Sequence, residues 1–277
     1  MLESNRRTIV PDEGLHVVEE VPLVSLRGVT KSFGAVKALQ SVNFDVYAGE
    51  VVAVVGDNGA GKTTLVKILA GDHKASSGEV LYKGEPVVIN SPADSRELGI
   101  ATVFQDLALC DNLDVVANLF LGREVGDMAL DEVEMEQRSW ALLRQLSAKL
   151  PTVRTPIASL SGGQRQTVAI ARSLVGEPTV VVLDEPTAAL GVAQTAEVLN
   201  LIERLRENGL GVVLISHNMA DVQAVADRVV VLRLGRNNGE FRVPDVSYEQ
   251  IIAAITGATD NAVSRRAKAV TNEGPPA

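Results

Sequence analysis

Apolar positions recur with two different periods along the chain, and the alternation between them predicts an α/β fold. SVNFDVY alternates Val42, Phe44 and Val46 with polar residues, which is the period of a strand covered on one face. EVVAVVG, TVVVLDE and GVVLISH are continuous apolar runs, typical of strands buried on both faces. Helical spacing follows in GKTTLVKILAG and GVAQTAEVLNLIERLREN. Strands that alternate with helices predict a mostly parallel sheet covered on both sides.

Shorter patterns add elements to this framework. PLVSLRGV predicts a first strand, GEVLYKGEPVVI a hairpin around Lys83 and Gly84, and IATVFQ a further strand. In the GVAQ segment, helical spacing predicts one packed face, formed by Val192, Thr195, Leu199, Ile202 and Leu205.

The texture of the chain changes at three places and suggests the domain organisation. Residues 106–160 read as helices broken by loops, which predicts a smaller helical lobe inserted into one domain spanning 22–257. Residues 1–21 are polar and predict a flexible N-terminal arm. Residues 258–277, which end in NEGPPA, predict a disordered C-terminal tail.

Bulk properties exclude some classes of function. The 277 residues carry a net charge of −9 and contain no long basic run, which argues against a nucleic-acid partner. Cys110 is the only cysteine, so we expect no intrachain disulfide and a reducing compartment. No signal peptide and no apolar run of about 18 residues is found, so we expect a soluble, cytosolic protein that docks on membrane proteins.

GDNGAGKTT carries the strongest chemical signal. It fits G-x-x-x-x-G-K-[ST] between a predicted strand and a predicted helix, where backbone N–H groups surround phosphate oxygens. Lys62 would reach the β and γ phosphates, and the Thr63 hydroxyl would bind Mg²⁺. A tight turn without a ligand is disfavoured by the flanking elements. The predicted nucleotide-binding residues here are Gly56, Asp57, Asn58, Gly59, Ala60, Gly61, Lys62, Thr63 and Thr64.

Two carboxylates end the TVVVLDE strand. Adjacent strand residues point to opposite sides, so Asp184 and Glu185 are expected to differ in role. Asp184 would hold Mg²⁺, and Glu185 would orient or deprotonate the attacking water. A helix cap or a solvated strand end would also leave an Asp-Glu pair. The phosphate loop in the same chain favours the catalytic interpretation.

Two more polar side chains follow predicted strands. His217 ends GVVLISH and is expected to sense the γ phosphate, although a solvated strand tip often carries a histidine. Gln105 ends IATVFQ, and its amide could reach Mg²⁺ or the attacking water.

Together with LSGGQRQ, these motifs occur in an order that resembles ATP-binding cassette (ABC) ATPases over residues 22–245. The resemblance implies ATP and Mg²⁺ as ligands. It also implies a P-loop fold with a RecA-like parallel core, an antiparallel β subdomain and a helical subdomain. Phe33 stands where the family places an aromatic that stacks on adenine; a structural core phenylalanine is the alternative.

The family resemblance also gives LSGGQ a role. Two cassettes face each other head to tail, and this motif closes over the ATP held by the other copy. It therefore implies an ATP-dependent dimer, with nucleotide contacts from Ser161, Gly162, Gly163 and Gln164. The family usually has Asp where this chain has Gly191, and that departure puts communication between the two sites in doubt.

Three segments resemble importers of simple sugars of the ribose, xylose and fructose type: GDHKASSGEVLYKGEPV, FQDLALCDNLDVVANLFLGRE and EPTAALGVAQT. This implies a peripheral ATPase at the cytoplasmic face of the inner membrane, a membrane permease docked near Gln105–Phe120, and an extracytoplasmic sugar-binding protein as indirect partner. The apolar residues of that segment could cover a local core or form the docking groove: Leu107, Leu109, Leu113, Val115, Val116, Leu119 and Phe120.

Other functions fit less well. A soluble ABC ATPase of translation or DNA repair should carry two cassettes, a long coiled coil or a basic surface, and none is evident. A separate-subunit ABC exporter motor remains the alternative for direction of transport. A GTPase would leave LSGGQ unexplained and lacks an N-K-x-D motif.

Overall fold

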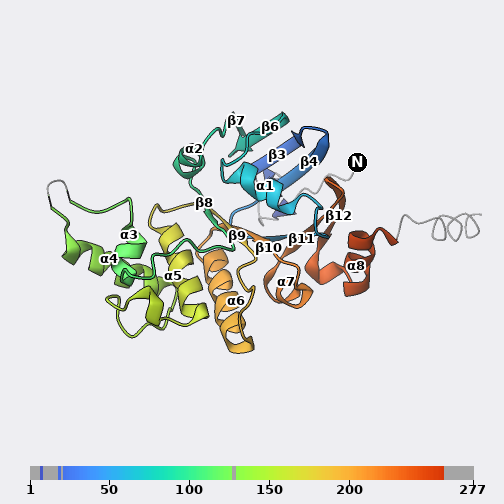
Figure 1. The fold of residues 1–277 in the computed structure, drawn as a ribbon. Coiled ribbons are helices and arrows are strands. Elements are labelled where there is room, and N and C mark those ends of the chain that lie inside the picture. Colours follow the sequence, from blue (N-terminus) through green and yellow to red (C-terminus); the bar gives the residue numbers. More distant parts are fainter. Residues whose placement is uncertain (1–6, 9–17, 20, 127–128, 259–277) are drawn as a thin grey trace, which may run out of the picture.

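A six-stranded sheet forms the middle layer of the computed structural model, which describes residues 7–8, 18–19, 21–126 and 129–258 (Figure 1). Its strand order is β12-β11-β5-β10-β9-β8, and only the β11–β12 pair is antiparallel. The predicted mostly parallel sheet is therefore confirmed. The strands are β5 (Val51–Val55), β8 (Ile100–Val103), β9 (Val180–Asp184), β10 (Gly211–Ile215), β11 (Arg228–Arg233) and β12 (Arg236–Arg242).

Both faces of this sheet are buried, as the continuous apolar runs predict. In β5, Val51 and Val55 join one hydrophobic cluster, while Val52 and Val54 join the other. Successive strand residues point to opposite faces, so one apolar run supplies two cores.

A four-stranded antiparallel sheet covers one face, above the central sheet in Figure 1. Its hairpin turns at Lys83 and Gly84, where φ is 51° and 86°, as the sequence predicts. Positive φ at both central residues suits a tight hairpin turn. The strands, in the order β4-β3-β6-β7, are β3 (Val24–Phe33), β4 (Val36–Val46), β6 (Ser77–Tyr82) and β7 (Glu85–Val87).

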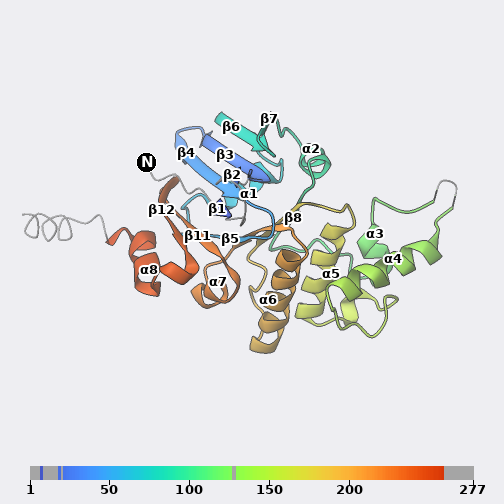
Figure 2. The ribbon, with the colours of Figure 1, turned by 180° about the vertical axis from the view of Figure 1, so that it is seen from behind.

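Helices cover the other face. Seen from behind, α5, α6 and α7 lie on the side of the central sheet away from the antiparallel sheet (Figure 2). Apolar residues of α1 belong instead to the cluster shared with the antiparallel sheet. The helices are α1 (Lys62–Leu69), α2 (Pro92–Glu97), α3 (Val115–Phe120), α4 (Glu132–Gln145), α5 (Gly162–Leu174), α6 (Val192–Glu207), α7 (Met219–Val225) and α8 (Tyr248–Thr256).

The predicted packed face of α6 is partly wrong. Val192, at the first turn of the helix, is 92% exposed. The buried face begins only six residues later, in the second turn of the helix. It is formed by Val198, Leu201, Ile202 and Leu205.

Residues 106–160 contain α3, α4 and a short 3₁₀ turn, and the predicted division into a main domain with a helical lobe stays a prediction. Buried Asn118 organises the loop before α3: its Oδ1 accepts from Cys110 N at 2.7 Å, and its Nδ2 donates to Asp114 O at 2.9 Å. Most of the apolar residues in this segment do cover a local core, namely Val115, Val116, Leu119 and Phe120.

The predicted arm (1–21) and tail (258–277) lie almost wholly outside the described residues. Within the arm, β1 (Arg7–Thr8) pairs antiparallel with β2 (Val18–Glu19).

Candidate functional site

The segment between β5 and α1 forms a loop that glycine alone can follow at two positions. Gly56 has φ of 149°, and a Cβ there would lie 2.1 Å from Leu232 O. A Cβ on Gly61 (φ 109°) would lie 2.7 Å from Leu39 Cδ2. Atoms of β4 and β11 approach these two positions so closely that any side chain there would collide with them, so the surrounding fold fixes the path of the loop. The nine predicted nucleotide-binding residues of this motif, Gly56 to Thr64, span the loop and the first three residues of α1.

Lys62 points its ammonium group back over this loop. Its Nζ donates to Gly56 O at 2.5 Å and to Asp57 O at 3.2 Å. Gly61 precedes α1 without a side-chain cap, so the first N–H groups of the helix are not used by a capping side chain. A cation and open N–H groups at a helix N-terminus together form a site for phosphate.

Asp184 is the last residue of β9, which lies between β8 and β10; β10 separates it from β5, the strand before the loop. Burial, and then the charge of Glu185, raise the pKa of the Asp184 carboxyl, while Lys62 and Lys67 lower it. The carboxylate thus lies within electrostatic reach of the phosphate-loop lysine.

Glu185 follows the strand in the left-handed region, with φ of 51°, and its N–H donates to Ile215 O at 3.0 Å. The two carboxylates therefore do have different environments, but a backbone turn separates them rather than the strand alternation that we expected from the sequence. Such a conformation costs a non-glycine residue energy and is often found at functional sites.

His217 lies where the sequence predicts, just beyond β10, and touches Glu185. His217 Nδ1 is 2.7 Å from Glu185 Oε2. The glutamate side chain is only 16% exposed, whereas the histidine side chain is 75% exposed. The mostly buried carboxylate is thus oriented by an imidazole that is itself open to solvent.

Gln105 is exposed two residues after β8, which lies beside β9. The carboxyl ends of β5, β8, β9 and β10 lie at one edge of the parallel sheet, so the structure brings Gln105 to the same edge as Asp184 and His217.

Phe33 ends β3 and is 44% exposed, which is more than a core phenylalanine would be. Its ring meets His73 edge-on, with centroids 5.2 Å apart, and Lys31 Nζ lies 5.1 Å from its centroid. The sequence pattern gave no sign of these two neighbours. The β3–β4 hairpin reaches the phosphate loop, since a Cβ on Gly61 would lie 2.9 Å from Ala38 O.

LSGGQ forms the N-terminus of α5, and its polar groups are engaged within the chain. Gln164 N donates to Ser161 Oγ at 3.3 Å, and Ser161 N donates to Gln164 Oε1 at 3.0 Å. The apolar residues of α5 and of α1 belong to the clusters on opposite faces of the central sheet. One chain does not bring the two glycine-rich tips together.

Gly191, the departure noted in the sequence, is the residue before α6. It is extended, with φ of −75° and ψ of 165°, and its N–H donates to Gln194 Oε1 at 3.2 Å. Gln194 is a residue that the sequence reasoning missed; the signal was a glutamine at the third helical position, the place of a capping-box side chain.

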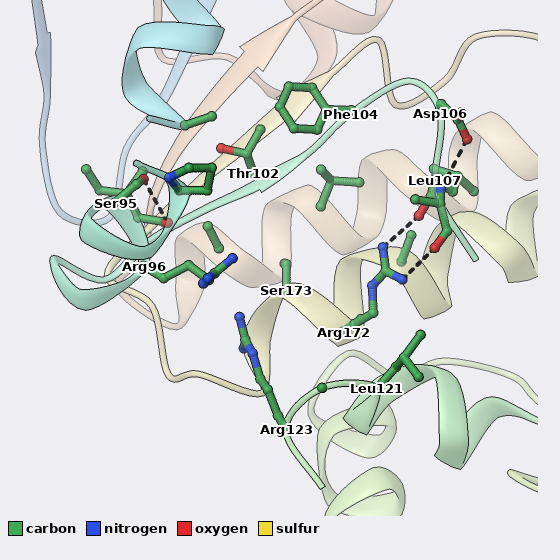
Figure 3. Close-up of a pocket in the computed structure, with 18 of the residues that line it drawn as sticks. Ser95, Arg96, Thr102, Phe104, Asp106, Leu107, Leu121, Arg123, Arg172 and Ser173 are labelled. Carbon is green, nitrogen blue, oxygen red and sulfur yellow. Dashed lines mark hydrogen bonds between the residues drawn. The ribbon is translucent and has the colours of Figure 1, made fainter. Parts of the chain in front are cut away.

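A groove of about 640 Å³ lies between α2, β8, the segment after Gln105 and α5 (Figure 3). Arg96 and Arg123 extend into it toward each other, and the sequence reasoning missed both. Arg172 of α5 donates to Leu107 O at 2.7 Å and to Ala108 O at 2.8 Å. Leu107 and Leu121 add apolar walls, so part of the apolar segment lines a groove as well as a core.

Charge accumulates in this groove. Burial and the nearby charge of Arg96 lower the pKa of Arg123, and burial lowers that of Arg172. Guanidinium groups crowded in this way would gain from an anionic partner.

Across residues 7–8, 18–19, 21–126 and 129–258, every helix is too short or too polar to span a bilayer. In the same ranges, no cluster of three or more His, Cys, Asp or Glu side chains is placed to hold a metal ion by itself.

A family model described as ABC transporter matches residues 39–188. The chain is 44% identical over 235 residues to the xylose/arabinose import ATP-binding protein XylG of Sulfolobus acidocaldarius, covering 84% of this chain and 94% of that protein. It is 42% identical to the fructose import ATP-binding protein FrcA of Rhizobium meliloti, covering 86% and 95%. A ribose import ATP-binding protein, RbsA of Yersinia pestis, is 39% identical, covering 87% of this chain and 47% of that protein.

Solved structures agree on the fold. The ADP conformation of MJ1267, an ATP-binding cassette of an ABC transporter, superposes with a TM-score of 0.74 at 26% identity, covering 85% of this chain and 95% of that one. The dimeric structure of MJ0796, a bacterial ABC transporter cassette, gives a TM-score of 0.68 at 27% identity, covering 79% and 98%. The predicted ABC-type α/β fold is confirmed.

Proposed function

Since this chain belongs to the ABC transporter family and is an ABC-type ATPase, we propose that it powers the import of simple sugars through a separate permease. One observation carries the proposal: over 94% and 95% of their length, two proteins named as sugar import ATP-binding proteins match this chain at 44% and 42% identity. Members of the family bind nucleotide, as the ADP-bound cassette illustrates.

The loop between β5 and α1 would bind the phosphates of ATP. Lys62 would exchange its contacts with Gly56 O and Asp57 O for phosphate oxygens. Mg²⁺ fits the donor set, because Thr63 offers a hydroxyl and Asp184 a carboxylate, the oxygen ligands that this ion prefers. Gln105 would add an amide oxygen from the neighbouring strand. When bound, the ion would neutralise charge that develops on the phosphates.

Glu185 would hold the attacking water. Its carboxylate is mostly buried, and its Oε2 is fixed by His217 Nδ1 at 2.7 Å, so its orientation is set before nucleotide arrives. A carboxylate positioned in this way can accept the proton of water, and His217 would then be free to contact the γ phosphate.

Replacing the carboxylate tests this assignment. Glu185→Gln should bind ATP as the wild type does but hydrolyse it at least about 100-fold more slowly, the contribution of a general base. Steady-state phosphate release and ATP-analogue titration measure the two properties. Glu249→Gln, an exposed change on α8, is the control. Hydrolysis that survives in Glu185→Gln would remove Glu185 from this role.

We also propose that the working unit is a dimer closed by ATP. The two glycine-rich helix N-termini belong to helices on opposite faces of the central sheet, so a second copy is needed to place Ser161–Gln164 over the nucleotide bound by Lys62. The dimeric MJ0796 cassette supports this arrangement. Glu185→Gln with ATP and Mg²⁺ should double its mass in light scattering. A monomer under these conditions, alone and beside its permease, would contradict the proposal.

The groove in Figure 3 is our candidate for the permease contact, on the cytoplasmic face of the membrane. Apolar walls would receive a short helix of the permease, and its carboxylates would meet Arg96, Arg123 and Arg172. The segment from Gln105 to Phe120 forms part of this groove and links it to the nucleotide edge of the sheet.

Charge reversal tests the contact. Arg123→Glu should abolish co-purification with the co-expressed permease while leaving the basal ATPase rate within about twofold, since an exposed substitution rarely disturbs the fold. Arg242→Glu, an exposed arginine on β12, is the matched control. Unchanged co-purification of Arg123→Glu would place the permease elsewhere.

The cargo itself would reach the permease from an extracytoplasmic binding protein. A deletion strain should lose uptake of one labelled sugar among xylose, arabinose, fructose and ribose, and the wild-type gene should restore it. Normal uptake of all four would exclude the proposed cargo class while leaving the ATPase assignment intact.

A further inference from the structure

Gln194 lies between two segments that belong to different ATP sites in the proposed dimer. We propose that Gln194 is a positioning residue that joins the Ser161–Gly163 tip to the turn after Glu185, so that the two ATP sites affect each other. This inference rests on the ATP-closed dimer proposed above. The link would stand in for a side chain that Gly191 does not have.

On one side, Gln194 holds the end of the turn. Its Oε1 accepts from Gly191 N at 3.2 Å. At α3, by contrast, the residue before the helix supplies the cap itself: Asp114 Oδ1 accepts from Ala117 N at 2.8 Å. Gly191 has no side chain, so only the half of the capping box that comes from Gln194 exists. The position of the turn therefore depends on the glutamine amide.

On the other side, the stem of Gln194 supports the α5 tip. A Cβ on Gly163 would lie 3.1 Å from Gln194 Cβ and 3.3 Å from its Cγ. Next to it, a Cβ on Gly162 would lie 3.1 Å from Leu190 Cδ2. The tip of α5 thus packs closely against the first turn of α6 and the residues before it, with little space for a side chain at Gly162 or Gly163.

The turn is also fastened at its other end, beside the catalytic pair. Thr187 Oγ1 donates to Asp221 Oδ2 at 2.7 Å, and Asp221 Oδ1 accepts from Asn218 Nδ2 at 3.0 Å. Asn218 directly follows His217. A shift of His217 or Glu185 when nucleotide binds would therefore reach Gly191, then Gln194, and then the tip that serves the other copy.

The test separates the oxygen of Gln194 from its stem. Gln194→Met keeps an unbranched stem against Gly163 and removes the acceptor, whereas Gln194→Glu keeps an acceptor that the same capping geometry uses. Gln250→Met is the matched control: in α8, Gln250 Oε1 accepts from Ser247 N at 2.9 Å, the same bond in a helix remote from the proposed site.

ATP hydrolysis is measured against ATP concentration, and dimer formation is measured in the Glu185→Gln background. Gln194→Met should lower the Hill coefficient toward one and raise the half-saturating ATP concentration about fivefold, the effect of one lost hydrogen bond. Gln194→Glu and Gln250→Met should keep wild-type values. Gln194→Met and Gln250→Met should show equal losses of melting temperature.

Three results would overturn the inference: wild-type cooperativity in Gln194→Met, the same kinetic loss in Gln250→Met, or the same loss in Gln194→Glu. A wild type that neither dimerises with ATP nor hydrolyses it would instead overturn the proposed function. The two failures are therefore distinguishable.

Discussion

The N-termini of α1 and α5 both follow glycine-rich sequences, yet they differ in how their backbone N–H groups are used. At α1, Gly61 supplies no capping side chain, and the Lys62 ammonium lies over the loop. At α5, Ser161 and Gln164 form a complete capping box, so the N–H groups of these two residues already have partners in the chain. One tip is open and the other is closed.

This difference indicates different tasks. The fold determines the shape of the open tip, because a side chain at Gly56 would collide with Leu232 O and one at Gly61 would collide with Leu39. It needs only an anion. The closed tip is already capped within the chain. A phosphate would reach it only when a second copy of the chain presents its bound nucleotide, as in the proposed dimer.

The largest expected effect comes from filling the open tip. Gly56→Ala should abolish nucleotide binding and cost more than about 4 kcal/mol in the free energy of unfolding, because the new Cβ would lie 2.1 Å from Leu232 O. Fluorescent ATP-analogue titration and urea unfolding measure both. For unfolding, Gly59→Ala is the control: it also has positive φ, but no atom lies within 4 Å of the new Cβ, so only about 1 kcal/mol of strain is expected.

Filling the closed tip should act mainly on the dimer. Gly163→Ala would press on Gln194 Cβ at 3.1 Å, which should weaken ATP-dependent dimerisation about tenfold, the effect of modest overpacking. ATP binding by the monomer should change less than dimerisation does, since Gly56–Thr64 are untouched and Gly163 reaches the monomer's own site only through Gln194. A larger loss in monomer binding than in dimerisation would contradict this order.

Uncapping the closed tip should cost less. Ser161→Ala removes the acceptor of Gln164 N, and loss of such a cap costs about 1 kcal/mol, or about 2–4 °C in melting temperature. Differential scanning calorimetry without nucleotide measures it. An unchanged melting temperature would show that the capping box carries no stability.

The smallest effect concerns Asp184 and pH. Burial and the charge of Glu185 raise the pKa of its carboxyl, so the ionised form is less favourable in the folded chain than in the unfolded one. Asp184→Asn should therefore raise the melting temperature of the nucleotide-free protein at about pH 8. The gain should shrink as the pH falls through the raised pKa and vanish below the ordinary value of 3.8. A gain that grows with acidity would reverse the sign and contradict this account.

Much of the fold follows from local sequence. The apolar run EVVAVVG predicts a buried strand, and Lys83-Gly84 predicts a turn. Both predictions succeed because the periodicity of apolar residues and the φ preferences of turn residues act over a few neighbouring positions. The phosphate loop was found in the same way. The prediction that Val192 packs against the core was wrong, because helical spacing identifies the apolar face of a helix but not how far along the helix the core extends.

Contacts between distant segments could not be predicted. Gln194 touches Gly163 only because α5 and α6 pack side by side, and Arg96 meets Arg123 only across a groove between separate elements. Nor could strand alternation foresee that Glu185 leaves β9 with φ of 51°, since this turn depends on the carbonyl of Ile215 in the next strand.

Arg172 makes α5 more than a scaffold. Its two bonds to the carbonyls of Leu107 and Ala108 link the last turn of α5 to the chain just after Gln105. If α5 tilts, these two hydrogen bonds carry Leu107 and Ala108 with it. The groove that we propose as the permease contact is thereby coupled to the orientation of α5, whose N-terminus carries LSGGQ.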